Sequence, residues 1–152
     1  MLIGVKIVQT KQLNMKNALK YGLLIGALSG LWILLMHFLN VYDQNKGGPM
    51  NIHWMEYLSA LIPFIGLYLG IKNYRNNING GKLEFFEGLM EGFKILLIGF
   101  VLYAAASSFY LQYSNSQVLT LDYYQRIGGA GLIGMLFTIV ISLLLMNRQH
   151  NL

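Results

Sequence analysis

The chain has no cysteine, only two prolines and only six acidic residues among its 152 positions. The lack of cysteine excludes disulfides, iron–sulfur clusters and thiol catalysis, and it leaves the redox compartment open. Charged residues make up 11% of the sequence, against about 25% in soluble domains. No Ser/His/Asp set, phosphate-binding glycine loop or zinc motif is present in the sequence. These absences leave no residues that point to an enzyme, and we expect the protein to have no enzymatic activity.

Long uncharged stretches fill most of the chain. They cover residues 21–42, 57–71, 95–121 and 127–147. A bilayer core of about 30 Å requires about 20 apolar helical residues, and three of the stretches reach that length. The second reaches it only if Trp54 and Glu56 lie among the lipid headgroups. The pattern predicts an all-α membrane protein with four transmembrane helices in an antiparallel bundle.

The expected helices belong to one transmembrane domain, residues 15–148. They are predicted near residues 18–40, 54–74, 85–113 and 129–146. Residues 1–14 form a cytoplasmic extension and residues 149–152 a short cytoplasmic tail. Met15-Lys16-Asn17, directly before the first helix, is typical of a bacterial start. Whether residues 1–14 belong to the native protein is therefore left open.

A four-residue sequence recurs at the same relative depth in the first and third helices. Leu23-Leu24-Ile25-Gly26 recurs as Leu96-Leu97-Ile98-Gly99. A duplicated helix hairpin, with its copies related by an axis along the membrane normal, gives such a repeat. A chance match of four apolar residues explains it equally well, so both interpretations stay open.

Basic residues divide unequally between the two ends of the helices. One side carries Lys6, Lys11, Lys16, Lys20, Lys72, Arg75, Lys82 and Arg148, and the other only Lys46 and Arg126. Because Lys and Arg accumulate in cytoplasmic loops, we expect both termini in the cytoplasm. The first apolar segment is longer than that of a cleaved signal peptide, so it should remain as an anchor. The net charge of +5 favours anionic lipid headgroups over nucleic acid as partners, since it lies at helix ends.

Short motifs at the helix ends resemble a known family. They are Lys16-Asn17-Ala18-Leu19-Lys20-Tyr21-Gly22, Gly70-Ile71-Lys72-Asn73-Tyr74-Arg75, Gly80-Gly81, Phe86-Glu87-Gly88 and Gly92-Phe93-Lys94. Over residues 15–148 the chain resembles the domain-of-unknown-function 4199 family, small four-helix bacterial inner-membrane proteins with no established activity. It departs from that pattern at Lys82-Leu83-Glu84 and over residues 1–14. The resemblance implies a bacterial inner membrane and supplies no functional residues.

Glycines recur every four residues along the first helix. Gly22, Gly26 and Gly30 share one face, and such a face lets another backbone approach closely. Gly66 and Gly70 repeat the spacing on the second helix. We expect these faces to pack within the chain, and a homodimer interface is the alternative.

Pro63 lies in the middle of the expected second helix. Its ring provides no N–H, so the carbonyl of Ser59 loses its usual donor four residues on. The sequence therefore predicts a kink at this point.

One stripe of the third helix carries charge. Glu84, Glu87, Glu91 and Lys94 are separated by three, four and three residues, so they share a face. Residues 95–113 alone extend about 28 Å, enough to cross the hydrocarbon core. We therefore expect the stripe at the cytoplasmic interface, with Glu91 paired to Lys94. A coupling-ion role is the alternative, because carboxylates inside a membrane mark ion paths.

Three polar side chains are expected near the outer surface: His37, His53 and Glu56. His53 and Glu56 are three residues apart at a helix start, a spacing that can present two ligands to one metal. Interfacial residues that merely share a depth give the same pattern, so we expect neither a metal nor any other cofactor.

We therefore expect a non-enzymatic accessory or interaction protein of the inner membrane. Its partners are the lipid bilayer and either a second copy or another membrane protein. The alternative is a small oligomeric transporter or channel for a small solute or ion, which needs a polar cavity. The mid-membrane polar groups are few: Ser29, Ser59, Ser107, Ser108, Thr138 and Ser142. Their convergence on a hydrated cavity or on dry packing distinguishes the two functions.

Overall fold

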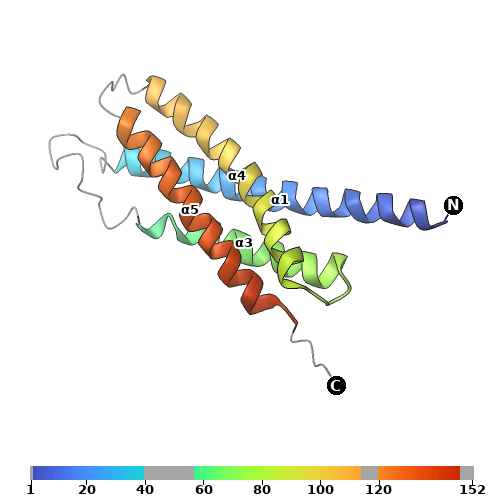
Figure 1. Ribbon diagram of the computed structural model, residues 1–152. Coiled ribbons are helices and arrows are strands. Elements are labelled where there is room, and N and C mark those ends of the chain that lie inside the picture. Colours follow the sequence, from blue (N-terminus) through green and yellow to red (C-terminus); the bar gives the residue numbers. More distant parts are fainter. Residues whose placement is uncertain (1, 40–56, 114–119, 148–152) are drawn as a thin grey trace.

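The computed structural model describes residues 2–39, 57–113 and 120–147, and the regular structure in these residues is entirely helical (Figure 1). The helices are α1 (Leu2–Phe38), α3 (Leu61–Asn73), α4 (Phe85–Tyr113) and α5 (Thr120–Leu145), and a π-helical turn, η1 (Tyr74–Ile78), continues α3. Three helices contain segments long and apolar enough to cross a membrane: Met15–Met36, Phe85–Phe109 and Gly128–Leu145. The chain is an all-α, multi-pass membrane protein.

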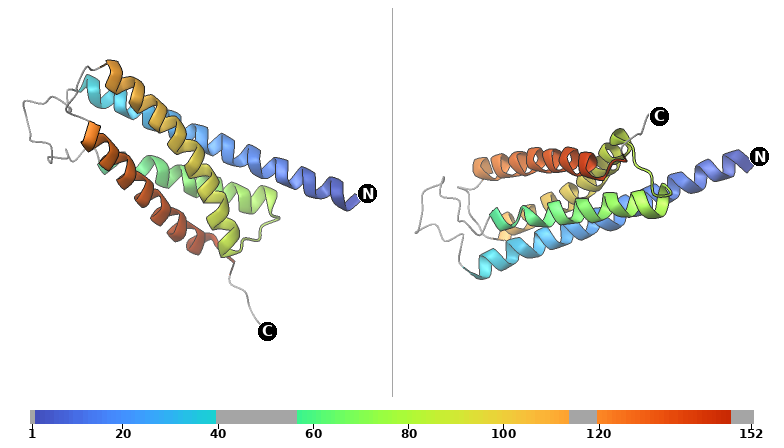
Figure 2. Two further views of the ribbon diagram at one scale, coloured as in Figure 1. Left: turned by 45° about the horizontal axis from the view of Figure 1, so that its top comes forward. Right: turned by 90° about the horizontal axis from the view of Figure 1, so that it is seen from below.

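The helix ends differ from the expected ones wherever a helix continues past its apolar segment. α4 has the predicted bounds, but α1 begins at Leu2 instead of 18 and α5 at Thr120 instead of 129. Hydropathy marks the length of helix that contacts lipid, whereas a helix continues as long as its backbone hydrogen bonds continue. The first turns of α1 project past the other helices in both views of Figure 2.

The second helix is shorter than expected, and Pro63 lies near its beginning. α3 has 13 residues, about 20 Å at 1.5 Å per residue, and a turn at Ser59–Ala60 precedes it. Proline is tolerated in a first turn, where N–H groups have no intrahelical partner. The Ser59 carbonyl accepts the Ile62 N–H at 3.2 Å. In place of a bend within a helix over 54–74, the helix is interrupted before Pro63; residues 54–56 lie outside the described part.

The helices pack around a core of apolar side chains contributed by all four. Its buried members are Ala18, Ile25, Leu67, Ile71, Tyr74, Leu83, Ile95, Ile141 and Leu145. α1 packs most extensively against α4, α4 also packs against α5, and α3 contacts all three of the others. Figure 1 shows α3 and α5 beginning near the end of the molecule where α1 and α4 finish.

The turn between α3 and α4 is joined to the end of α5. Gly80 and Gly81 have φ values of 63° and 82°, a left-handed conformation that glycine adopts without a Cβ clash. Just after them, the Leu83 N–H donates to Asn147 Oδ1 at 3.1 Å, and the Asn147 N–H donates to the Leu83 carbonyl at 3.0 Å. This reciprocal pair places the α3–α4 turn and the end of α5 on the same side of the molecule.

Candidate functional site

The charged stripe of α4 divides into an exposed part and a buried part. Glu84 is exposed and Glu87 partly buried, but Glu91 is only 1% exposed. Glu91 is therefore shielded from solvent by its own chain, while the expected place of the stripe at the cytoplasmic interface stays a prediction. Glu91 is one turn before Ile95, which is fully buried, so it continues the face of α4 that packs against other helices.

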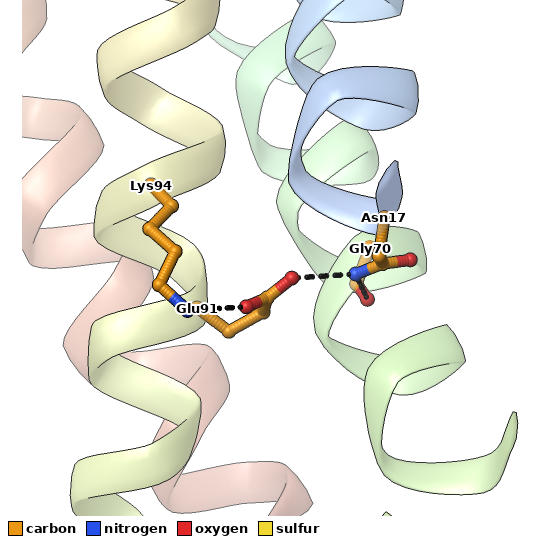
Figure 3. A network of polar contacts seen from close by, with 4 residues as sticks. All are labelled: Asn17, Gly70, Glu91 and Lys94. Atoms are coloured by element: carbon orange, nitrogen blue, oxygen red, sulfur yellow. Dashed lines mark hydrogen bonds and ion pairs between the residues drawn. The ribbon is translucent and has the colours of Figure 1, made fainter. Parts of the chain in front are cut away.

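A hydrogen-bonded cluster surrounds the buried carboxylate (Figure 3). Asn17 of α1 donates through Nδ2 to Glu91 Oε1 at 2.8 Å and to the Gly70 carbonyl of α3 at 3.1 Å. Lys94 Nζ lies 3.1 Å from the other oxygen, Oε2. The expected pairing of Glu91 with Lys94 is present, and both carboxylate oxygens have a donor.

Two further asparagines extend the cluster along α3 and η1. Asn73 Nδ2 donates to Asn17 Oδ1 at 2.8 Å, and Asn77 Nδ2 donates to Asn73 Oδ1. Asn17, only 4% exposed, thus uses both its amide oxygen and its amide nitrogen. The cluster formed by Asn17, Asn73, Asn77, Glu91 and Lys94, called the polar cluster below, joins α1, α3 and α4.

The polar cluster is electrically balanced and lies near one end of the spans. Lys94 neutralises Glu91 while its side chain remains 37% exposed, because its long aliphatic stem carries the ammonium toward water. Asn17 is two residues into the span that begins at Met15, and Glu91 six residues into the one that begins at Phe85. At 1.5 Å per residue these positions are about 3 Å and about 9 Å from the span ends.

The glycine stripe of α1 lies against α4. A Cβ added at Gly22 would lie 2.7 Å from Ile98 Cβ, and one at Gly30 would lie 3.2 Å from Ala106 Cβ. At Gly26 it would lie 2.5 Å from Leu102 Cβ. The residue numbers of these contacts rise together on the two helices, so α1 and α4 run in the same direction.

The glycines of α3 permit equally close contacts with α1 and α4. A Cβ at Gly70 would lie 2.6 Å from Ile95 Cδ1 and 3.2 Å from Tyr21 Cβ, and one at Gly66 would overlap Ile25. Here the residue numbers on α1 fall as those on α3 rise, so these two helices run in opposite directions. The glycines that we expected to serve helix packing lie at these contacts.

Three of the mid-span hydroxyls, those of Ser107, Ser108 and Thr138, bond within their own helices. Ser107 Oγ donates to the Tyr103 carbonyl at 2.6 Å, and Thr138 Oγ1 donates to the Gly134 carbonyl at 2.9 Å. Ser142 is fully buried, and its Oγ has no hydrogen-bond partner within the described part of the chain. Thr138 and Ser142 lie against Gly92 and Gly88 of α4, so these two side chains are in close helix packing.

The outer-face metal hypothesis falls mostly outside the described residues. His53 and Glu56 belong to the segment that the structure does not describe, and the same holds for the side chain of His37. Within residues 2–39, 57–113 and 120–147, no group of three or more His, Asp or Glu is placed to hold a metal ion.

Sequence reasoning missed the three asparagines of the polar cluster. Asn73 and Asn77 are four residues apart, which places them on one helix face, and Asn17 lies next to the first apolar segment. Each is an ordinary helix-end residue by itself. Only the approach of α1 to α3 and α4 reveals Asn17 as a partner of Glu91, and Asn73 and Asn77 as the residues that extend this contact.

The comparisons with known proteins give one match. A family model described as "Protein of unknown function (DUF4199)" matches residues 20–127, and it confirms the resemblance drawn from the helix-end motifs. The matched segment includes Glu91, Lys94, Asn73 and the glycine stripe, whereas Asn17 precedes it. No curated protein and no solved structure matches the chain significantly.

Proposed function

The chain belongs to the DUF4199 family, whose description states no activity, and from the geometry we propose that it is a non-enzymatic accessory or interaction component of a bacterial inner membrane. The observation that carries this proposal is that its buried polar side chains are engaged mainly by partners of its own chain. Both oxygens of Glu91 are hydrogen-bonded or ion-paired, and Thr138 and Ser107 bond their own helices. The polar cluster therefore holds α1, α3 and α4 together, and the hydroxyls of Ser107 and Thr138 are satisfied within their own helices.

The beginning of the apolar part of α5 supplies a surface for another transmembrane helix. Among the described residues, a Cβ added at Gly128 or Gly129 would meet nothing within 4 Å, and the adjacent Ala130 is exposed. Small residues let a second helix approach closely, and the glycines of α1 and α3 are already used within the chain. We propose that a partner helix, from a second copy or another membrane protein, packs at Gly128–Ala130.

Replacing Gly129 with leucine tests this surface. We expect the wild-type protein to migrate in mild detergent as a complex larger than the monomer, and Gly129→Leu to migrate as the monomer. The melting temperature of the monomer should stay unchanged, because a Cβ at this position meets nothing within 4 Å in the described part of the chain. Leu136→Ala, a change at an exposed position of the same helix, is the matched control. A wild-type protein that is monomeric and free of any stoichiometric partner would contradict the proposal.

In the proposed topology, α3 is the fourth span of an antiparallel bundle and both termini are cytoplasmic. The basic residues near the spans divide eight to two. The hydrogen bonds between Asn147 and Leu83 support this topology, because they join the α3–α4 turn to the end of α5.

Reporter fusions test the topology at two positions. We expect fluorescent-protein fusions at Gly81 and at Leu152 to fluoresce, and alkaline phosphatase fusions at both to be inactive in intact cells. Phosphatase activity at Leu152 would reverse the orientation. Activity at only one of the two positions would show that α4 and α5, the helices between them, do not both span.

A small transporter or channel is the alternative, and the burial of Glu91 is the observation that favours it. An ionisable group within a transmembrane segment often marks an ion path. The cluster nevertheless lies near the ends of the spans, and Lys94 already occupies the position that a bound cation would take beside Oε2.

A further inference from the structure

An apolar groove runs between α1 and α3. It has a volume of about 340 Å³ and is lined by Leu24, Leu28, Trp32, Leu58, Leu61, Ile62, Ile65, Gly66 and Leu69. Leu24 and Leu28 on one wall and Ile65 on the other are all exposed. The groove is therefore accessible from the side, where the hydrocarbon of the bilayer lies.

Two lysines stand at one end of this groove. Lys20 is one turn before Leu24 on α1, and Lys72 is three residues after Leu69 on α3, so each continues the helix face that lines the groove. Lys20 Nζ lies 5.4 Å from the centroid of the Tyr21 ring, and Lys72 Nζ lies 5.4 Å from that of Tyr68. Within the described residues the only salt bridge joins Lys94 to Glu91. Both ammonium groups are thus left without a carboxylate.

The groove has the length of one membrane leaflet. Lys20 and Trp32 are twelve residues apart on α1, and Lys72 and Leu61 are eleven apart on α3. At 1.5 Å per residue these separations are about 18 Å and about 17 Å. Half of a hydrocarbon core of about 30 Å is about 15 Å. A chain that begins at the lysines reaches the middle of the bilayer near Trp32.

We propose that this groove binds an anionic phospholipid of the leaflet that faces the α3–α4 turn. Its phosphate lies between the ammonium groups of Lys20 and Lys72, and one acyl chain follows Leu24 and Leu28 toward Trp32. The apolar walls match a hydrocarbon chain, and the two uncompensated positive charges match a headgroup with net negative charge. A partner helix in the same place would leave both charges without a counterion. The inference is independent of the partner proposed at Gly129.

Trp32 is a built-in reporter of the occupied groove. The chain has two tryptophans, so Trp54→Phe leaves Trp32 as the only one. The full-length protein is reconstituted in phosphatidylcholine vesicles that contain phosphatidylglycerol or phosphatidylcholine with brominated acyl chains, which quench nearby tryptophan fluorescence. We expect half-maximal quenching by brominated phosphatidylglycerol at a mole fraction about fivefold below that needed with brominated phosphatidylcholine, or lower still. A factor of about five is what one interfacial lysine contributes.

Lysine variants separate a headgroup site from general contact with lipid. Lys20→Gln combined with Lys72→Gln should abolish the preference, whereas Lys82→Gln, at an exposed position in the α3–α4 turn, should retain it. Circular dichroism verifies that each variant is folded. Equal quenching by both lipids would overturn the proposal, as would a preference that survives the double substitution. If neither lipid quenches Trp32, protein fills the groove. That result would also overturn the proposal.

Discussion

Gly26→Leu should be the most destabilising single substitution in the glycine stripe. A Cβ at this position would lie 2.5 Å from Leu102 Cβ and 3.0 Å from the Gly99 carbonyl oxygen. The second contact is with the backbone, so α1 and α4 must separate to admit the side chain. Overpacking of a core costs about 1–3 kcal/mol and occasionally more, and we expect about 3 kcal/mol here. The loss should appear as a lower melting temperature in detergent and lower expression.

Ala27→Leu is the matched control, because it adds the same side chain one position along α1 where the residue is exposed. It should melt like the wild type. Gly30→Ala should fall between the two, since in the described part of the chain its Cβ meets only Ala106 Cβ, at 3.2 Å. Equal melting temperatures for Gly26→Leu and Ala27→Leu would refute the α1–α4 contact.

Helix packing at the glycines could be predicted because the physical signal lies within one helix. Three glycines at spacing four, such as Gly22, Gly26 and Gly30, cost helix propensity, about 1 kcal/mol each relative to alanine in water. Contact with lipid gives no compensation for this cost, so a protein neighbour is required. The sequence alone does not choose between the second helix and α4 as that neighbour, since register between helices depends on all the contacts at once.

The burial of Glu91 could not be predicted from its position along the helix. Distance from the end of the apolar segment places Glu91 near an interface, and that estimate agrees with its place about 9 Å from the end of its span. It does not specify which side of α4 faces Asn17 and Gly70. The donors to the carboxylate come from residues 17 and 94, and the first of these is far away in the sequence.

The first residues of α1 and α5 were predicted wrongly for a different reason. The predicted starts followed hydropathy, and Thr120–Gly128 is polar enough to resemble a loop although it is helical. Outside the hydrocarbon core, water satisfies backbone N–H and C=O groups as well as a helix does, so composition does not determine where the helix begins. Inside the core the constraint is strict, and α4 begins and ends where it was expected.

Asn17→Leu should be about as damaging as Gly26→Leu, and for an electrostatic reason. It removes the donor to Glu91 Oε1 and to the Gly70 carbonyl, and it leaves Asn73 Nδ2 without its acceptor. Removing one partner of a buried charge costs about 3–5 kcal/mol. We expect a destabilisation of about 3 kcal/mol, because Lys94 remains beside the carboxylate. Chemical or thermal unfolding of the purified protein in detergent measures it.

The double variant Asn17→Leu/Glu91→Leu distinguishes a buried charge from simple loss of packing. It removes the carboxylate together with its donor, and Lys94, already 37% exposed, is free to turn into water. Hydrophobic replacement of a buried polar pair is often neutral or stabilising. The double variant should therefore be more stable than Asn17→Leu alone. A double variant less stable than the single one would mean that Asn17 acts through its shape.

The same carboxylate decides between the accessory function and transport. Glu91→Gln keeps the shape of the side chain and an oxygen that accepts from Asn17. Its free energy of unfolding should therefore lie within about 1 kcal/mol of the wild-type value. For an accessory protein, wild-type and Glu91→Gln proteoliposomes should pass protons and sodium no faster than protein-free vesicles. A wild-type flux that Glu91→Gln abolishes without loss of folding would assign the polar cluster to an ion path. In that case the ion pair with Lys94 would have to open once in each transport cycle, because it closes the position beside Oε2 in this structure.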